Sequence, residues 1–224
     1  MQIEHPSSET EARALQETLA AQVISEDQFD SITTIAGTDV AYDDATNQLV
    51  GAIVVLNAST LDIIETQVVT ESVRFPYIPG LFSFRELPPL LSAFEQLTHK
   101  PDMIVCDGQG LAHPRRFGLA CHLGVTLDIP TIGCGKTRLT GTHKALIEMR
   151  GASAKLIDNE QVIGEVLRTQ DNIKPVYVSV GHKVSLSTAR DWILKLTPKY
   201  RLPETTRQAD QQVNRALKAL QAQS

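Results

Sequence analysis

The chain has 224 residues, of which 42% are hydrophobic and 21% charged, and its net charge is −5. This length suits one domain with a sizeable core, and the composition is that of an ordinary soluble protein. No apolar run is long enough for a membrane span, and residues 1–8 lack a signal-peptide pattern, so we expect a cytoplasmic protein without a membrane partner. We also expect a monomer.

The charges are unevenly distributed. Residues 1–73 hold 13 acids and one base, whereas residues 74–224 hold 13 acids and 20 bases. A basic second part is compatible with a surface that contacts phosphates, although the two kinds of charge could also be dispersed by folding. The three cysteines form no C-x-x-C pair, which favours buried free thiols over a zinc site.

The first part of the chain predicts one helix and three strands. A capping box, Ser8-x-x-Glu11, precedes a helix over residues 12–23. Apolar, β-branched runs follow, and short links between them favour antiparallel pairing. The expected strands are residues 32–42, 49–57 and 61–69.

A stiff loop and two strand–helix units come next. Two prolines and a glycine make residues 74–80 rigid and extended. A helix over residues 81–99 is expected to restart at Pro88-Pro89. A strand at 103–106, a helix at 117–127 and a strand at 131–134 then predict parallel pairing through right-handed crossovers.

The remaining chain predicts three more strands and two helices: strands at 155–158, 162–167 and 175–180, a helix capped by Ser187 and running to about 196, and a helix over 205–220. Three antiparallel strands followed by two parallel ones resemble the ribonuclease H-like fold. That resemblance implies an α/β domain, a mixed sheet in the order 3-2-1-4-5, helices on both faces and added C-terminal strands and helices. We expect one domain over residues 1–224, with its core at about 32–212.

The stretch at 101–118 places Asp107 at the end of a short apolar strand, facing a Gly-rich turn. Open α/β sheets bind ligands at such strand ends, although Asp107 could also be an ordinary helix N-cap. Two nucleotide motifs fail here. A dinucleotide fingerprint needs glycine at position 113, which is His113, and a P-loop ending at Lys136 needs glycine at position 130, which is Pro130.

The predicted sheet order places Asp39 on a strand beside Asp107. Adjacent strands lie about 4.8 Å apart, and two carboxylates at about 5 Å repel by roughly 3 kcal/mol at an effective dielectric of about 20. A protein offsets such repulsion with a proton or a cation. Oxygen ligands favour Mg²⁺ or Mn²⁺.

Glu86, after the stiff loop, and Lys136, after the strand at 131–134, could reach the same edge. This set suits phosphodiester hydrolysis, in which a metal activates water and Lys136 stabilises charge. No Ser or Cys nucleophile with a nearby base is evident, so direct attack by water is expected.

Each residue also has a structural interpretation. Asp39 could be a turn residue, Glu86 a solvated first-turn acid and Lys136 an exposed loop lysine. His113 could be a ring hydrogen-bonded to backbone. The loop around Tyr77 could be a hydrophobic plug under the sheet.

Several segments, in order, resemble the signature segments of the endonuclease V family: RFPYIPG at 74–80, FRE at 84–86, DGQG at 107–110, HPRR at 113–116, GCGK at 133–136, VGHKVSL at 180–186 and YRLPE at 200–204. The resemblance runs from about residue 32 to 210. It implies a Mg²⁺-dependent repair endonuclease that recognises deoxyinosine in DNA and cuts the second phosphodiester bond on its 3′ side, leaving 3′-hydroxyl and 5′-phosphate ends.

The resemblance also implies residue roles. The metal carboxylates would be Asp39, Glu86 and Asp107, and Lys136 would be catalytic. The wedge beside the lesion would be Pro76, Tyr77, Ile78 and Pro79. A flipped base, which is cheaper to unstack when mispaired, would enter a pocket formed by Gly80, Phe82, Gly108 and His113.

Two positions depart from the common family pattern. Gln109 replaces a frequent His, which leaves its role open. Asp210 stands where the family has His or Asp and is expected as a fourth metal-site residue, unless it is an exposed helix residue. An endoribonuclease directed at inosine in RNA, or a non-catalytic nucleic-acid-binding module, remains an alternative.

Overall fold

The computed structural model describes residues 6–222. One sheet contains all eight strands of this part of the chain: β1 (Thr34–Asp43), β2 (Gln48–Asn57), β3 (Ile63–Ser72), β4 (Met103–Cys106), β5 (Thr131–Gly135), β6 (Ser153–Asp158), β7 (Gln161–Leu167) and β8 (Val176–His182). The helices are α1 (Glu9–Ala20), α2 (Ser83–Gln96), α3 (Leu119–Leu127), α4 (Leu186–Lys195) and α5 (Glu204–Gln221).

The sheet order is β3-β2-β1-β4-β5-β8-β7-β6, which confirms the predicted order of the first five strands. The pairs β1–β4 and β4–β5 are parallel, and the other neighbours are antiparallel. The three added strands extend the sheet beyond β5. The sheet edge formed by the carboxyl ends of β4 and β5 therefore continues along the start of β8, the end of β7 and the start of β6.

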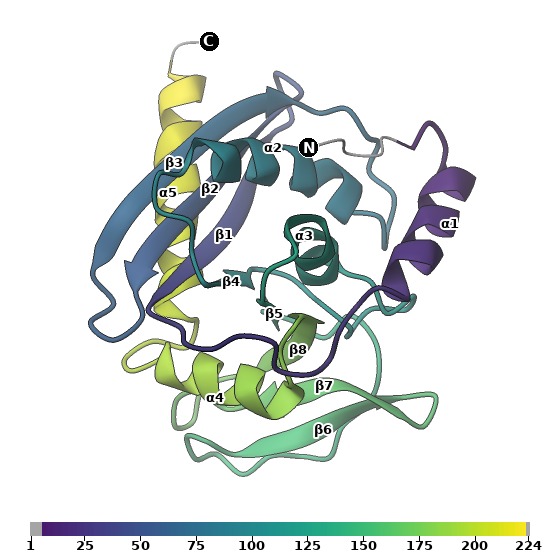
Figure 1. Cartoon of the computed structure of the whole chain (residues 1–224), viewed down its shortest axis with the longest axis vertical. Helices are drawn as coiled ribbons and strands as arrows, with labels where there is room; N and C mark the ends of the chain where they lie inside the picture. The colour runs from purple at the N-terminus through teal and green to yellow at the C-terminus, as the bar shows by residue number, and fades with distance from the viewer. Residues whose placement is uncertain (1–5, 223–224) are drawn as a thin grey trace.

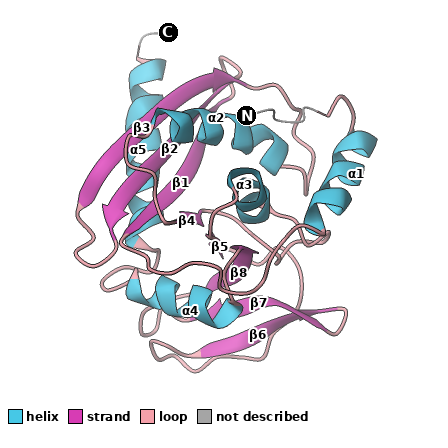
Figure 2. Ribbon diagram, in the orientation of Figure 1, coloured by secondary structure: helices cyan, strands magenta, loops and turns pink. Residues whose placement is uncertain are grey.

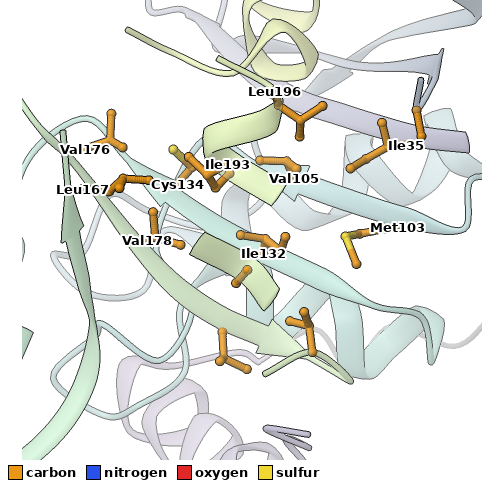
Figure 3. Packing of buried hydrophobic residues seen from close by; sticks show 14 residues of the cluster. Ile35, Met103, Val105, Ile132, Cys134, Leu167, Val176, Val178, Ile193 and Leu196 are labelled. Carbon is orange, nitrogen blue, oxygen red and sulfur yellow. The ribbon is translucent and has the colours of Figure 1, made fainter. Parts of the chain in front are cut away.

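Helices cover both faces of the sheet (Figures 1 and 2). Apolar residues of α2 and α3 pack on one face, against alternate residues of β1, β2 and β4. On the other face, α5 crosses β1 and β2, and α4 covers the middle of the sheet. Figure 3 shows this second core, in which Ile35, Met103 and Val105 pack near Ile193 and Leu196.

Close contact with α5 depends on Gly37 in β1. A Cβ atom at Gly37 would lie 2.1 Å from the backbone carbon and oxygen of Thr205, a distance that no side chain can accept. The absence of a side chain lets the start of α5 rest directly on β1. This contact brings Asp210, on the next turns of α5, over the same region of the sheet.

Two sequence predictions about helices are wrong. The helix α2 does not restart at Pro88-Pro89 but runs through both prolines. A proline inside a helix costs about 3 kcal/mol, and here both rings are buried, with Pro89 packed against Gly51 of β2. We attribute the continuity of the helix to this packing and to the buried leucines on either side.

The second error concerns the cap of α4. Ser185, not Ser187, is the N-cap, and its hydroxyl accepts a hydrogen bond from the Thr188 backbone N–H at 3.3 Å. The cap of α1 is as predicted, with Ser8 accepting from the Glu11 N–H. All three cysteines are free and buried, also as predicted. None of the helices within residues 6–222 combines the length and apolarity needed to cross a bilayer.

Candidate active site

Asp39 and Asp107 meet on one face of the sheet. The last parallel pair between β1 and β4 joins Thr38 to Cys106, so the two aspartates form the next pair along the strands. Alternation puts Asp39 on the same face as Ile35 and Gly37, and Asp107 on that of Val105, which is the face covered by α4 and α5. The carboxyl groups are close enough for the charge of Asp107 to raise the pKa of Asp39.

This proximity changes the acidity of both groups. Burial and the charge of Asp107 raise the pKa of Asp39 well above its ordinary value, although Lys136 opposes the shift. Burial also raises the pKa of Asp107, against the opposing effect of Lys136. The pair therefore retains a proton at a pH where isolated carboxyl groups would both be ionised.

Lys136 lies immediately after β5 and forms an ion pair with the Asp107 Oδ2 atom. Burial alone would lower the pKa of Lys136, but its hydrogen bond to Asp107 and the nearby acids raise it, so the amine is charged. Its backbone is also held, because Arg201 Nη2 donates to the Lys136 carbonyl at 2.6 Å. Lys136 is thus paired within the acidic cluster, although 40% of its side chain is exposed.

Glu86 approaches the same edge from α2, on the opposite face of the sheet. The Tyr42 hydroxyl donates to Glu86 Oε1 at 2.7 Å. Burial is the main cause that raises the pKa of Glu86 to about 7; the Tyr42 hydrogen bond opposes it and the charge of Asp107 adds to it. This half-buried, hydrogen-bonded carboxyl is not a solvated first-turn acid.

Asp210 completes the acidic set from α5. Its charge acts on three members of the cluster, since it raises the pKa of Asp39, of Asp107 and of Lys136. Asp210 is half-buried, so it is not the exposed helix residue of the alternative interpretation. The sheet, α2 and α5 therefore bring all five predicted catalytic and metal-site residues to one region.

The chemistry of these donors fits a hard divalent cation. All four acids offer oxygen atoms, the ligands that Mg²⁺ and Mn²⁺ prefer, and the paired aspartates require positive charge nearby. Within residues 6–222, however, no three His, Cys, Asp or Glu side chains are arranged to hold an ion. In this arrangement Lys136 and a retained proton balance the negative charge of the paired aspartates. To bind a cation, Asp107 would therefore have to give up its ion pair with Lys136.

A cavity of ≈330 Å³ opens beside the acids. Its lining includes Glu86, Asp107 and Lys136. It also includes all four residues predicted for a base pocket: Gly80, Phe82, Gly108 and His113. The structure thus brings the four predicted pocket residues and three of the four predicted catalytic residues, all but Asp39, to the lining of one cavity.

One wall of this cavity is organised around the Gly80 carbonyl. It accepts hydrogen bonds from Gln16 Nε2 at 3.0 Å, Arg115 Nη2 at 2.7 Å and His113 Nε2 at 3.0 Å. His113 Nδ1 accepts from the Arg115 backbone N–H, so the Nε2 atom carries the ring proton. Burial and the charge of Arg115 lower the pKa of His113 to about 4, which keeps the ring neutral.

His113 is therefore a ring hydrogen-bonded to backbone that also lines the cavity, and its role in a base pocket stays a prediction. Gly80 has φ of +79°, a left-handed conformation that favours glycine. The peptide group of Gly80 is consequently held in one conformation at the point where the loop at 74–80 leads into α2.

The predicted wedge is divided between buried and exposed side chains. Phe75 is buried and Ile78 partly buried in a small cluster with residues of α1 and α2. Tyr77 is 65% exposed, and its ring lies edge-on to Phe82 at 5.0 Å between centroids. Pro76 and Pro79 are exposed. The plug interpretation describes Phe75 and Ile78, whereas Tyr77 projects into solvent.

Sequence reasoning missed two residues that support the site. Gln16 is almost fully buried, binds the Gly80 and Phe117 carbonyls and accepts from Arg115 Nε. Its only sequence signal is a polar residue within an otherwise apolar helical stripe. Tyr42 shares a strand with Asp39, and nothing in the sequence indicates its bond to Glu86.

The structure gives Gln109 a specific position. Its Nε2 atom donates to the Thr137 carbonyl at 3.0 Å, which links the loop after β4 to the loop after β5. Its Oε1 atom is buried without a hydrogen-bond partner among the described residues. A Cβ atom at Gly135 would lie 2.1 Å from Nε2, so this link needs glycine there.

The sheet order and the acids on β1 and beyond β4 define a ribonuclease H-like α/β protein. Comparison with known proteins specifies the family. The family model for endonuclease V matches residues 17–211, and the chain belongs to that family. It is therefore a nuclease, a hydrolase that acts on nucleic acid.

Three relatives illustrate the similarity. Endonuclease V of Nocardia farcinica is 52% identical over 96% of this chain and 95% of its own length. The crystal structure of endonuclease V from Streptomyces avermitilis has a TM-score of 0.93 and 47% identity, and covers 99% of this chain and 98% of its own. Endonuclease V of Ciona intestinalis, in complex with a 24-residue DNA containing an inosine followed by a ribo-adenosine, has a TM-score of 0.83 and 26% identity, covering 94% of this chain and 98% of its own.

Proposed function

We propose that this protein is a DNA repair endonuclease that recognises deoxyinosine and hydrolyses the second phosphodiester bond on its 3′ side. The products carry 3′-hydroxyl and 5′-phosphate ends. The observation that supports this proposal best is the meeting of Asp39, Asp107 and Lys136 beside a cavity lined by the predicted base-pocket residues.

The cavity would receive the flipped hypoxanthine base. Its walls carry backbone groups at Gly80 and Gly108 and an aromatic ring at Phe82, which suits hydrogen bonding to a base edge together with stacking. Tyr77 would fill the space that the flipped base leaves. The Ciona relative, solved with inosine-containing DNA, supports this choice of substrate.

The acids would hold a divalent cation, Mg²⁺ or in its place Mn²⁺, with Asp39, Asp107, Glu86 and Asp210 as candidate ligands. When bound, such an ion would polarise a phosphoryl oxygen and help to activate the attacking water. Lys136 would place its positive charge near the scissile phosphate and stabilise charge that develops there. Tyr42 would orient Glu86 through its 2.7 Å hydrogen bond.

Cleavage of inosine-containing RNA is the second candidate function. The Ciona complex places a ribose nucleotide directly after inosine, so a relative accommodates a 2′-hydroxyl at that position. Nothing in the lining of the cavity identifies a group reserved for a deoxyribose sugar.

The decisive experiment is cleavage of matched duplexes that differ only in one deoxyinosine, with and without Mg²⁺. The expected result is a single nick at the second bond 3′ to deoxyinosine, dependent on Mg²⁺ or Mn²⁺. An equivalent RNA strand tests the second candidate. Equal cleavage of the adenine control would contradict lesion recognition, and no cleavage of any substrate would favour a binding module.

A further inference from the structure

The segment from Lys136 to Lys155 concentrates positive charge. It contains five Lys or Arg residues and one acid, Glu148, in a chain whose net charge is −5. The segment starts at the catalytic lysine candidate and ends in β6. It thus connects the site already described to the far end of the sheet.

A second hollow lies along this segment. It measures about 630 Å³ and is bounded by the loop that precedes β6 and by β6 itself, and its lining contains no acidic residue: Thr142, His143, Lys144, Ala145, Ser153, Ala154, Lys155 and Ile157. In the described part of the chain, one isolated backbone bridge, Thr142–Ile157, covers this outer edge of β6. The loop and the strand diverge beyond that bridge and leave the hollow between them.

The lysines of the hollow form no ion pair among the described residues; Glu165 of β7, which lies opposite Lys155, pairs with Arg190 at 3.7 Å. Lys144 and Lys155 are exposed, and neither forms an ion pair within residues 6–222, nor does Arg138 on the path from Lys136. Other bases nearby are already used: Arg150 donates to the carbonyls of Thr169, Thr197 and Leu194, and Arg116 pairs with Asp158. Unpaired cations around an acid-free hollow favour an anionic ligand.

The topology places this hollow on the same edge of the sheet as the catalytic acids. Gly135, which ends β5, pairs with Tyr177 at the start of β8, and Leu167, which ends β7, pairs with Ser153 at the start of β6. Four strand spacings of about 4.8 Å separate β4 from β6, which is about 19 Å. In B-form DNA this span corresponds to about five or six base-pair steps of about 3.4 Å.

We propose that this hollow, with Lys144 and Lys155 as its charged groups, binds the phosphodiester backbone of the nucleic acid at about five or six base pairs from the cleavage site. This inference rests on the proposed function, because it takes the strand at the active site to be nucleic acid that continues along the sheet edge. A peptide added to the open edge of β6 is the competing occupant, but it would not require the three bases without an ion pair, Arg138, Lys144 and Lys155, along this segment.

The test compares the charge-reversed variant Lys144→Glu/Lys155→Glu with the matched control Lys195→Glu/Lys218→Glu, whose exposed lysines lie on α4 and α5. Binding to a deoxyinosine duplex with about twelve base pairs on each side of the lesion is measured in EDTA at several salt concentrations. At about 0.9 per phosphate contact, the slope of log Kd against log salt should fall by about two for the variant and should not change for the control.

Cleavage supplies the second measurement. The variant should show about a tenfold higher KM at low salt on the long duplex, with kcat unchanged. Trimming one flank to about three base pairs, too short to reach the hollow at about 3.4 Å per step, should abolish the difference between wild type and variant. The conservative variant Lys144→Arg/Lys155→Arg should behave like the wild type.

Equal salt slopes and equal KM values for the two charge-reversed variants would overturn the proposal. So would a difference that persists in both trimmed duplexes, whichever of the two flanks has been shortened. Since the binding measurement needs no cleavage, it tests this inference even if the protein fails to cut deoxyinosine, and that failure would count against the proposed function alone.

Discussion

The acidic edge and the loop at 74–80 form two sides of the same site, but they are fixed by different means. Asp39 and Asp107 are placed by the pairing of buried strands, where every residue position follows from the register. The loop is placed mainly by the Gly80 carbonyl, which three side chains bind. The comparison indicates that the acidic side chains are positioned by the sheet and the loop at 74–80 by a local set of hydrogen bonds.

The register of β1 against β4 is also fixed by hydrogen bonds at the opposite end of the two strands. Asp102, just before β4, accepts hydrogen bonds from the backbone N–H groups and hydroxyls of Thr33 and Thr34 at 2.8–3.1 Å. These bonds tie the start of β1 to the start of β4. A slip of one residue would turn Asp39 to the opposite face, so this distant anchor preserves the acidic pair.

Removal of the pair should give the largest effect. Asp107→Ala, or Asp39→Ala, is expected to lower kcat by at least about 10³-fold, because both the charge of the site and its cation ligands are reduced. Binding of deoxyinosine DNA in EDTA should change little. Single-turnover cleavage and a binding titration separate the two effects, and near-normal cleavage by either variant would refute the assignment of the acids.

A change in the loop should act on recognition instead. Tyr77→Ala is expected to weaken binding of the deoxyinosine duplex by about tenfold, because loss of one stacking ring costs about 1–3 kcal/mol. The rate constant at saturating substrate should be nearly unchanged. The matched control is Tyr200→Ala, a second exposed tyrosine outside the loop. Unaltered affinity in Tyr77→Ala would mean that the ring does not enter the DNA.

Removal of the Asp102 hydrogen bonds should lower both the stability of the protein and its activity. Asp102→Ala is expected to lower the free energy of unfolding by about 1–2 kcal/mol, a value discounted for partial exposure, and to reduce kcat several-fold. Urea unfolding followed by circular dichroism measures the first effect. A stability loss without any effect on kcat would show that the register does not depend on these hydrogen bonds.

The effect of Asp102→Ala on the free energy of unfolding should also depend on pH. Burial alone would raise the pKa of Asp102, but its bonds to Thr33 and Thr34 outweigh burial and lower it. The stabilising effect is therefore complete above the usual pKa of about 3.9 and is lost as pH falls through the lowered value. The difference in stability between wild type and variant should be constant near neutrality and should shrink below about pH 4.

The smallest expected effect concerns Gln109. Gln109→Ala removes the donor to the Thr137 carbonyl, and a bond worth about 1 kcal/mol corresponds to about a fivefold lower kcat if Lys136 shifts with that loop. Gln208→Ala, at a half-buried position of α5, is a suitable control because its amide donates to Glu204 Oε1 at 2.6 Å, within the same helix. An unchanged kcat in Gln109→Ala would show that the position of Lys136 does not depend on the bond between Gln109 and the Thr137 carbonyl.

Several features could be predicted from sequence because they depend on short-range patterns. Apolar runs and turn residues determine the strands, and the chain order then determines which strands are neighbours. That sufficed to place Asp39 beside Asp107. It also sufficed for Lys136, which follows the next strand in the sheet.

Other features depend on contacts between distant segments. Gln16 meets the Gly80 carbonyl across 64 positions and the Phe117 carbonyl across 101, and no local pattern encodes either bond. The continuity of α2 through Pro88 and Pro89 depends on packing against Gly51 of β2, which local proline rules do not include. The ion pair between Lys136 and Asp107 likewise could not be predicted from sequence, because it depends on where the two side chains lie in the folded protein.

The contact between Gly37 and Thr205 has a consequence for synthesis of the protein. Since α5 supplies Asp210 and covers β1, a nascent chain that has not yet released this helix from the ribosome lacks a finished acidic cluster. Chains cut short before residue 204 would possess the paired aspartates on an uncovered strand. The complete acidic cluster would thus form only after α5 has left the ribosome and packed on β1.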